Sequence, residues 1–203
     1  MKLYFAPGTC SFSPHLALRE AGIDFELVKV DHRKHVLAAD GADYLQINPK
    51  GYVPTLELDD GRRLTEGPAI VQYIADLKPE SGLAPQAGTF ERYKLQEWLG
   101  YISSEIHKGF GPLFKPNTPE EFKAIAKENL IARIAYVAEH LAGHDYLLGN
   151  QFTVADGYLF TVLNWCQYVG IDLGQWPSLV AFQARVGSRP SVKAAQAAEA
   201  AKA

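Results

Sequence analysis

The sequence of 203 residues contains little cysteine and no long apolar run. Its two cysteines, Cys10 and Cys166, are far apart. They cannot form the disulfide framework of a small secreted domain, so we expect two reduced thiols and a cytoplasmic protein. No apolar run approaches the roughly 18 residues of a membrane span. The start, "MKLYFAPG", lacks the long apolar core of a signal peptide, and we therefore expect no membrane association.

An excess of charge of one sign is also absent. The chain has 20 basic and 23 acidic residues, and its net charge is -3. Because the two signs are well mixed, there is no basic patch of the kind that binds nucleic acid, and we expect no nucleic-acid partner. Hydrophobic residues make up 47% of the chain, which is enough to build a proper core.

The first 80 residues alternate between strand and helix patterns. The first strand and the second are separated by a helix that Gly22 ends, which predicts a parallel pair with a right-handed crossover. An Asp-Asp-Gly turn between two short strands predicts a hairpin. The expected order is strand 2–6, helix 11–21, strand 25–30, hairpin 55–65 and helix 67–77.

Helical patterns follow the proline- and glycine-rich stretch 78–90. Thr118-Pro119-Glu120-Glu121 reads as a capping box for a helix that runs to Gly143, and Thr153 with Asp156 reads as a second box. The expected helices are 91–110, the one that ends at Gly143, the strongly apolar 154–169, and one that starts at Trp176-Pro177. We predict an α/β domain over 1–80, a linker over 81–90 and an all-helical domain over 91–203.

Cys10 lies at the expected start of helix 11–21. A helix N-terminus carries unpaired amides and partial positive charge, which favour a thiolate. No second cysteine stands in the Cys-x-x-x-Pro pattern, so this thiol would pair more naturally with a small soluble thiol. The alternative is a half-buried, inert cysteine, and the position of Cys10 alone leaves both interpretations open.

Two further motifs suit an extended, peptide-like ligand. A cis bond at Val53-Pro54 would turn the chain sharply and leave the Val53 backbone available for pairing, although trans is the usual form. Glu66 and Gly67 open helix 67–77, where amides suit a carboxylate and Glu66 suits an ammonium group. The alternative is that Glu66 only stabilises the helix, because an acidic residue at a helix N-terminus interacts favourably with the helix dipole.

A polar stripe runs along the expected helix 91–110. Gly100, Ser104 and His107 stand at i, i+4 and i+7, opposite the apolar face. A glycine inside a helix costs about 1 kcal/mol relative to alanine. Close approach of a ligand or of another backbone would explain it, and a solvated polar face is the alternative.

These motifs occur in an order that resembles a known family. Cys10 after a strand, Val53-Pro54 before a hairpin, and "LTEG" before a helix resemble the thioredoxin-like half of a glutathione transferase. The strings "INPKGYVP", "AIVQYIADL", "EWLGYISSEIHKGFGPLF" and "FTVADGYLFTVLNW" extend the resemblance to the bacterial beta class over nearly the whole chain.

The resemblance implies a thioredoxin-like domain that binds glutathione, a helical domain that lines the electrophile site, and a homodimer. It implies that glutathione is the co-substrate and that its thiolate is conjugated to small hydrophobic electrophiles, a detoxification reaction. Thiol–disulfide exchange or reductive dehalogenation through Cys10 are alternatives, and a non-catalytic binding module is another. We expect no metal, because the histidine pairs in the sequence lack a third ligand.

The resemblance also assigns residues, with Cys10 and His107 as the catalytic pair. The Val53 backbone would pair with the cysteinyl part of glutathione, and Glu66 and Gly67 would hold its γ-glutamyl end. The family often has lysine at the position of His35, which would contact the glycine carboxylate, and Lys34 is the alternative here. The remaining implied contacts lie in the helical domain, some of them reaching the glutathione of the partner subunit: Gly100, Ser104, Glu105, Ile106 and His107.

Two other hydroxyls are rivals of Cys10. Tyr4 lies in the first strand, and some transferase classes activate glutathione with a tyrosine near the N-terminus. Ser11 follows Cys10 directly, and other classes use a serine near this point. Where the family commonly has asparagine, this chain has Gly100, which predicts a wider electrophile pocket.

Overall fold

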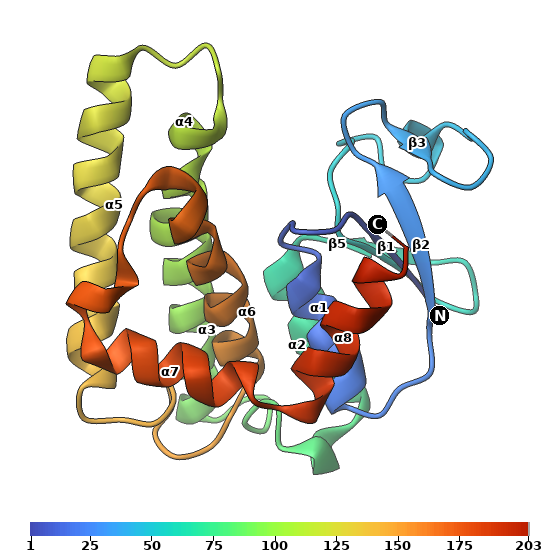
Figure 1. Cartoon of the computed structure of the whole chain (residues 1–203). Helices are drawn as coiled ribbons and strands as arrows, with labels where there is room; N and C mark the ends of the chain where they lie inside the picture. Colours follow the sequence, from blue (N-terminus) through green and yellow to red (C-terminus); the bar gives the residue numbers. More distant parts are fainter. Residues whose placement is uncertain (203) are drawn as a thin grey trace. The chain divides into compact units, whose positions relative to one another are not determined.

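A computed structural model describes residues 1–202, which form two compact units (Figure 1). The first unit joins residues 1–84 to the C-terminal segment that begins at Arg189, and the second spans residues 85–188. The sequence predicts that the whole of 91–203 belongs to the helical domain. The C-terminal segment instead belongs with the first unit.

A mixed five-stranded sheet forms the centre of the first unit, in the order β3-β2-β1-β4-β5. The predicted parallel pair of β1 and β2 and the antiparallel hairpin of β4 and β5 are both present. β1 lies in the middle of the sheet, and Leu3 and Phe5 are fully buried. The strands are β1 (Lys2–Phe5), β2 (Glu26–Asp31), β3 (Val36–Leu37), β4 (Thr55–Glu57) and β5 (Arg63–Thr65).

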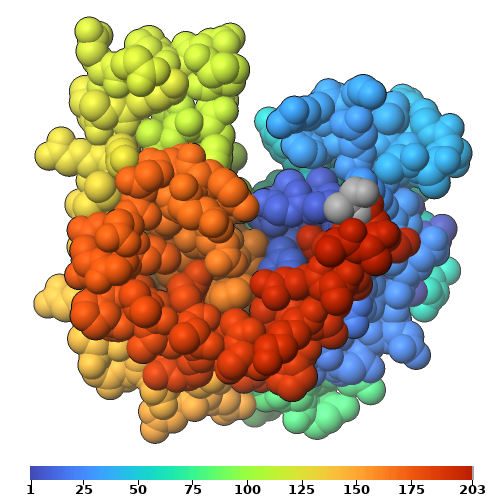
Figure 2. Space-filling model, in the orientation of Figure 1, coloured from blue at the N-terminus to red at the C-terminus, as the bar shows by residue number. Residues whose placement is uncertain are grey.

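Three helices pack in this unit: α1 (Phe12–Glu20), α2 (Gly67–Leu77) and α8 (Pro190–Ala200). α8 lies beside α1, and Figure 2 shows its red surface against the blue of the N-terminal segment. The buried His15 of α1 lies 2.9 Å from Glu199 of α8. Arg189 also donates twice to Glu20, over 2.6 and 2.7 Å. These polar contacts explain why the last helix belongs to the first unit.

The second unit is helical but less regular than predicted. The expected helix 91–110 is broken into α3 (Phe90–Tyr101), a π-helical turn η3 (Ile102–His107), a 3₁₀ turn η4 (Lys108–Phe110) and α4 (Gly111–Phe114). All residues of α6 (Val154–Leu163) are buried, as the strongly apolar pattern predicts, but this α-helix ends at Leu163 and does not extend to residue 169. The remaining elements are α5 (Glu120–Leu141), η5 (Asn164–Val169), η6 (Leu173–Gln175) and α7 (Pro177–Gly187). Short 3₁₀ turns η1 (Tyr44–Gln46) and η2 (Pro79–Ser81) belong to the first unit.

Only one of the two predicted capping boxes forms. α5 begins at Glu120, and its N-cap residue is Pro119, which has an extended ψ of 142°. Thr118 lies one residue before the N-cap, and no side-chain hydrogen bond caps this helix. At α6, in contrast, the Thr153 amide and hydroxyl both donate to Asp156 Oδ2, over 2.8 and 2.9 Å. This second box is therefore confirmed.

Within residues 1–202, no helix combines the length and the apolar character that a membrane span requires.

Candidate functional site

Cys10 lies in a turn that leads into α1, directly before the N-cap residue Ser11. Its half-buried thiol lies 3.5 Å from the carbonyl oxygen of Val53, to which it donates. The expectation of unpaired amides needs correction, because the Phe12 and Ser13 amides donate to the carbonyls of Thr9 and Cys10. The sulfur therefore sits beside the start of a helix dipole, one short turn before the regular helix.

The Val53-Pro54 peptide bond is cis, the less usual of the two forms considered from the sequence. Tyr44 and Asn48 support the preceding segment, since the Tyr44 hydroxyl and the Asn48 amide both donate to the carbonyl oxygen of Tyr52, over 2.9 and 2.7 Å. The fold thus brings Val53 and Cys10 together, although they stand 43 positions apart in the chain.

Glu66 precedes α2 with φ 71° and ψ 111°, a conformation that residues other than glycine seldom adopt. Its carbonyl accepts the amides of Ala69 and Ile70, which anchors it to the first turn of the helix. Its carboxylate is exposed and forms a 2.6 Å ion pair with Lys50. Lys50 also donates to Thr65. We did not identify Lys50 from the sequence, because nothing in its local pattern indicates this long-range pair.

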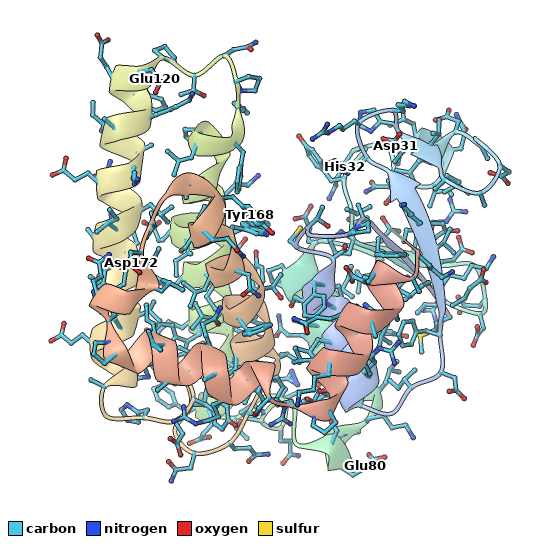
Figure 3. The ribbon with its side chains drawn as sticks, viewed as in Figure 1. Asp31, His32, Glu80, Glu120, Tyr168 and Asp172 are labelled. Carbon is cyan, nitrogen blue, oxygen red and sulfur yellow. The ribbon has the colours of Figure 1, made fainter. Side chains whose placement is uncertain are left out.

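Lys34 and His35, the two candidates for a carboxylate contact, have different surroundings. The His35 ring lies 3.1 Å from the Gly51 carbonyl oxygen and is half-buried, and the His35 backbone has φ 55°. A Cβ at Gly51 would lie 2.8 Å from that ring, so this glycine permits the close approach. Lys34 is 78% exposed, and its ammonium lies 3.7 Å from Asp31 at the end of β2 (Figure 3).

Hydrogen bonds to the backbone amides of Lys34 and Arg33 lower the pKa of Asp31 and keep its carboxylate charged. The side chain of Lys34 is the more exposed candidate, and the ring of His35 is the more firmly positioned one.

The two rival hydroxyls are structural. The buried Tyr4 hydroxyl lies 3.3 Å from Glu57, and burial, with the nearby Glu57 carboxylate, raises the pKa of Tyr4 to about 12. Ser11 is fully buried, and its hydroxyl bonds to both the amide and the carbonyl of Ala6. Tyr4 therefore keeps its proton, and Ser11 fastens the turn that carries Cys10.

In the helical unit, the predicted polar stripe is spread over different directions by the π-helical turn. Gly100 and Ser104 are exposed, and Glu105 pairs with Arg133 of α5 at 3.0 Å. Ile106 was predicted as a ligand contact, but its side chain is fully buried and belongs to the core. A π-helical turn has more residues per turn than an α-helix, so the i, i+4, i+7 rule does not apply across it.

His107 faces α6 and the turn that follows it. Its Nδ1 lies 2.6 Å from the hydroxyl of Tyr158, and its ring meets that of Trp165 edge-on, with the centroids 4.9 Å apart. Phe110 and Phe114 also pack against Trp165. Trp165 and Tyr158 both fall in the strongly apolar segment 154–169, and the sequence pattern singles out neither as a partner of His107. A tyrosine in an otherwise apolar helix is the available signal, since a buried hydroxyl needs a partner.

The two thiols have contrasting environments. Cys166 is almost fully buried, and burial raises its pKa to about 12, so it stays protonated. Cys10 is half-buried and lies just before the N-terminus of α1. Cys10 is therefore the better candidate for thiol chemistry. Among residues 1–202, no cluster of three or more potential metal ligands occurs.

Comparison with known proteins identifies the family. The model of the glutathione S-transferase N-terminal domain matches residues 9–77, and that of the C-terminal domain matches residues 101–190. The chain is 48% identical to glutathione S-transferase GstA of Escherichia coli O157:H7, over 98% of both chains.

Two solved structures are similar throughout. A sphingomonad glutathione S-transferase complexed with glutathione has a TM-score of 0.95 and 50% identity, covering 98% of this chain and 99% of its own. A beta-class glutathione S-transferase of Sphingomonas chungbukensis has a TM-score of 0.95 and 46% identity, covering 98% of both chains. The chain belongs to the glutathione S-transferase family. Within that family it is a bacterial beta-class enzyme.

Proposed function

We propose that this enzyme binds glutathione in the first unit and transfers its thiolate to small hydrophobic electrophiles. The observation that carries the proposal is the contact between the Cys10 thiol and the Val53 carbonyl. A cysteinyl residue paired in an extended conformation with the Val53 backbone would bring its own sulfur close to Cys10. The glutathione bound in the sphingomonad relative supports this choice of ligand.

The rest of the tripeptide finds suitable groups nearby in the same unit. The Glu66 carboxylate, which pairs with Lys50 in this structure, suits the α-ammonium group at the γ-glutamyl end of glutathione. The Gly67 amide at the start of α2 suits the α-carboxylate of the same end. Two groups are candidates for binding the glycine carboxylate. They are the exposed ammonium group of Lys34 and the ring of His35, which contacts the Gly51 carbonyl oxygen. We propose that His35 positions this end and that Lys34 supplies long-range attraction.

The catalytic task is to favour the thiolate of glutathione and to orient it. The Cys10 thiol is a donor that can turn from the Val53 carbonyl to a thiolate beside it, and the partial positive charge of α1 acts on the same place. The thiolate then displaces a leaving group from the electrophile: a new carbon–sulfur bond forms, and the leaving group departs with the bonding electron pair.

The helical unit supplies the remaining groups in this proposal. His107 is a polar donor among aromatic side chains, which include Phe110, Phe114 and Trp165. Phe110 and Trp165 are buried, whereas Phe114 is 48% exposed and offers an apolar face that suits a planar, apolar electrophile. Ser104 and Glu105 lie on the same π-helical turn and are proposed to contact glutathione.

A homodimer in the cytoplasm is part of the proposal. Several large aromatic side chains are strongly exposed in the single chain, which favours a partner surface; they are Tyr52, Phe90, Tyr93 and Tyr136. A second copy of the chain would cover apolar area that is otherwise in contact with water. Sedimentation of the purified chain as a monomer at micromolar concentration would contradict this part.

A direct test uses immobilised glutathione followed by a turnover assay with an aromatic halide. We expect retention on the resin, elution by soluble glutathione, and conjugate formation that depends on glutathione concentration. Failure of both retention and turnover would overturn the proposal. Retention without turnover across a broad panel of electrophiles would instead support the non-catalytic binding module.

A second candidate activity is thiol–disulfide exchange. It is favoured by the accessible Cys10 and by the environment of Cys166, which is buried and protonated and thus unsuited to resolve a disulfide. In this reaction the Cys10 thiolate attacks a mixed disulfide between glutathione and a second thiol, the second thiol leaves as a thiolate, and glutathione remains on Cys10 as a mixed disulfide. A free glutathione thiolate then attacks this disulfide, which releases oxidised glutathione and restores the Cys10 thiolate.

Gly100→Asn is expected to narrow the substrate range. Gly100 is exposed and nothing lies within 4 Å of a Cβ added there, so the new side chain fits without displacing its neighbours. We expect the rate with a bulky electrophile to fall about tenfold relative to a small one, the size of effect that one misplaced group has in an apolar pocket. Initial rates with the two electrophiles measure the ratio.

Gly100→Ala is the matched control for this prediction. It removes the flexible glycine from α3 but adds little volume, so it should raise helix stability by about 1 kcal/mol and leave the rate ratio unchanged. A ratio that stays the same in Gly100→Asn would contradict the role assigned to Gly100.

A further inference from the structure

The imidazole of His107 is held between two buried aromatic residues of the helical unit. The hydroxyl of Tyr158, in α6, lies 2.6 Å from Nδ1, and the two rings meet edge-on at 82°. Trp165, in η5, approaches the imidazole ring from another position. Tyr158 and Trp165 are 2% and 9% exposed, so neither partner has room to move away from the histidine.

The direction of the hydrogen bond follows from the chemistry of its two partners. A phenol hydroxyl is a better donor than acceptor, and the unprotonated nitrogen of a neutral imidazole is a strong uncharged acceptor. The 2.6 Å distance is short even for a hydroxyl donor. This distance is consistent with a Tyr158 hydroxyl that donates to Nδ1 of a neutral imidazole. A neutral imidazole carries one ring proton, and that proton must then lie on Nε2.

We propose that Tyr158 is a positioning residue that holds His107 in the Nε2–H tautomer, so that Nε2 donates a hydrogen bond during glutathione transfer. The proposal rests on the function proposed above for His107. Without Tyr158 the ring proton would divide between the two nitrogens, and part of the enzyme would present an acceptor where the reaction needs a donor. Trp165 complements Tyr158 by fixing the plane of the ring.

The π-helical turn has a role in this arrangement. Glu105 of η3 pairs with α5, whereas His107 of the same turn bonds to α6. Glu105 and His107 are two residues apart on this wider turn, and their side chains contact different helices. π-helical turns inside helices are frequent at functional sites. The π-helical turn η3 places His107 within hydrogen-bonding distance of Tyr158, which sets the tautomer of the imidazole in this proposal.

The test combines a spectroscopic measurement with turnover. In the full chain with ¹⁵N-labelled histidine, long-range proton–nitrogen spectra report which ring nitrogen of His107 carries the proton. We expect the Nε2–H form in the parent chain and a mixture of both tautomers in Tyr158→Phe. The variant should lower kcat about fivefold, as the loss of one hydrogen bond predicts, and leave the KM for glutathione unchanged.

A double-variant comparison separates positioning from general damage. In a chain that carries His107→Ala, adding Tyr158→Phe should lower kcat no further, because the tyrosine acts through the imidazole. Tyr101→Phe is the matched control: it removes a hydroxyl that donates to the Arg133 carbonyl in the same unit, and it should leave the tautomer and kcat unchanged.

Three results would overturn the proposal. They are an Nδ1–H tautomer in the parent chain, unchanged histidine spectra in Tyr158→Phe, and additive losses of kcat in the double variant. The first of these needs no variant, so poor folding of Tyr158→Phe cannot protect the proposal. Failure of the proposed function is distinguishable: His107→Ala would then retain full turnover, whatever the spectra show.

Discussion

Replacing Asp156 with alanine is expected to lower the free energy of unfolding by about 3–5 kcal/mol, because it leaves three buried donors without an acceptor. These donors are the Leu147 amide and both the amide and the hydroxyl of Thr153. Asp156 is fully buried, so water cannot replace the lost carboxylate cheaply. Denaturant unfolding of the parent chain and the variant measures the difference.

Two companion variants sharpen this result. Asp156→Asn keeps the size of the side chain but has one acceptor oxygen instead of two, so it should be destabilised by a similar amount. Asp172→Ala removes an exposed carboxylate that accepts a bond from the Gly174 amide, and it should cost about 1 kcal/mol or less (Figure 3). A loss below about 1 kcal/mol in Asp156→Ala would contradict the assigned role.

The same carboxyl group predicts a pH dependence. Burial raises the pKa of Asp156 from its ordinary value of 3.8 to about 6, so between these values the folded chain holds a proton that the unfolded chain releases. Its contribution to stability is therefore full below about pH 4 and is lost as the pH rises to about 6. The stability difference between the parent chain and Asp156→Asn should shrink over that interval. A difference that grows with pH would have the wrong sign.

Cys10→Ala is expected to abolish the mixed disulfide with glutathione and to reduce conjugation without ending it. Only Cys10 offers an accessible thiol, but conjugation uses the sulfur that glutathione brings. A hydrogen bond to a charged group contributes about 1.5–3 kcal/mol, so losing the Cys10 donor should slow conjugation by at least about tenfold. Mass spectrometry after incubation with oxidised glutathione and a steady-state conjugation assay measure the two activities separately.

Cys10→Ser separates the two possible roles of the thiol. Serine keeps a donor at this position and lacks the sulfur, so it should lose the mixed disulfide and retain more conjugation than alanine. Cys166→Ala is the matched control, since that buried thiol should affect neither activity. If serine and alanine slow conjugation equally, Cys10 does not act as a donor to the glutathione thiolate.

Local patterns predicted the regular elements well. The parallel pair of β1 and β2, the hairpin of β4 and β5, and α2 over residues 67–77 follow from alternation, an Asp-Asp-Gly turn and a helix start near Pro68. The box at Thr153 was also predicted, because both of its partners lie within four residues. Each of these features depends on neighbours along the chain.

Apart from the local box expected at Thr118, the failed predictions involve partners that are distant in sequence. The periodicity that predicted one helix over 91–110 carries no sign of the π-helical turn, which is coupled to packing against α5 and α6. The burial of the Ile106 side chain is likewise a result of tertiary packing that the local pattern does not show. The C-terminal helix looked like part of the helical domain, but its contacts with α1 join residues 184 positions apart.

By itself, the sequence determined the class of fold, the order of its elements and the resemblance to beta-class glutathione transferases, and it singled out Cys10, Val53 and Glu66 as candidate site residues. Only the tertiary structure decided that the Cys10 thiol meets the Val53 carbonyl, that Lys50 pairs with Glu66, and that Tyr158 bonds to His107. The reason is physical. Helices and strands arise from interactions between near neighbours, whereas a catalytic geometry arises from side chains that packing brings together from distant parts of the chain.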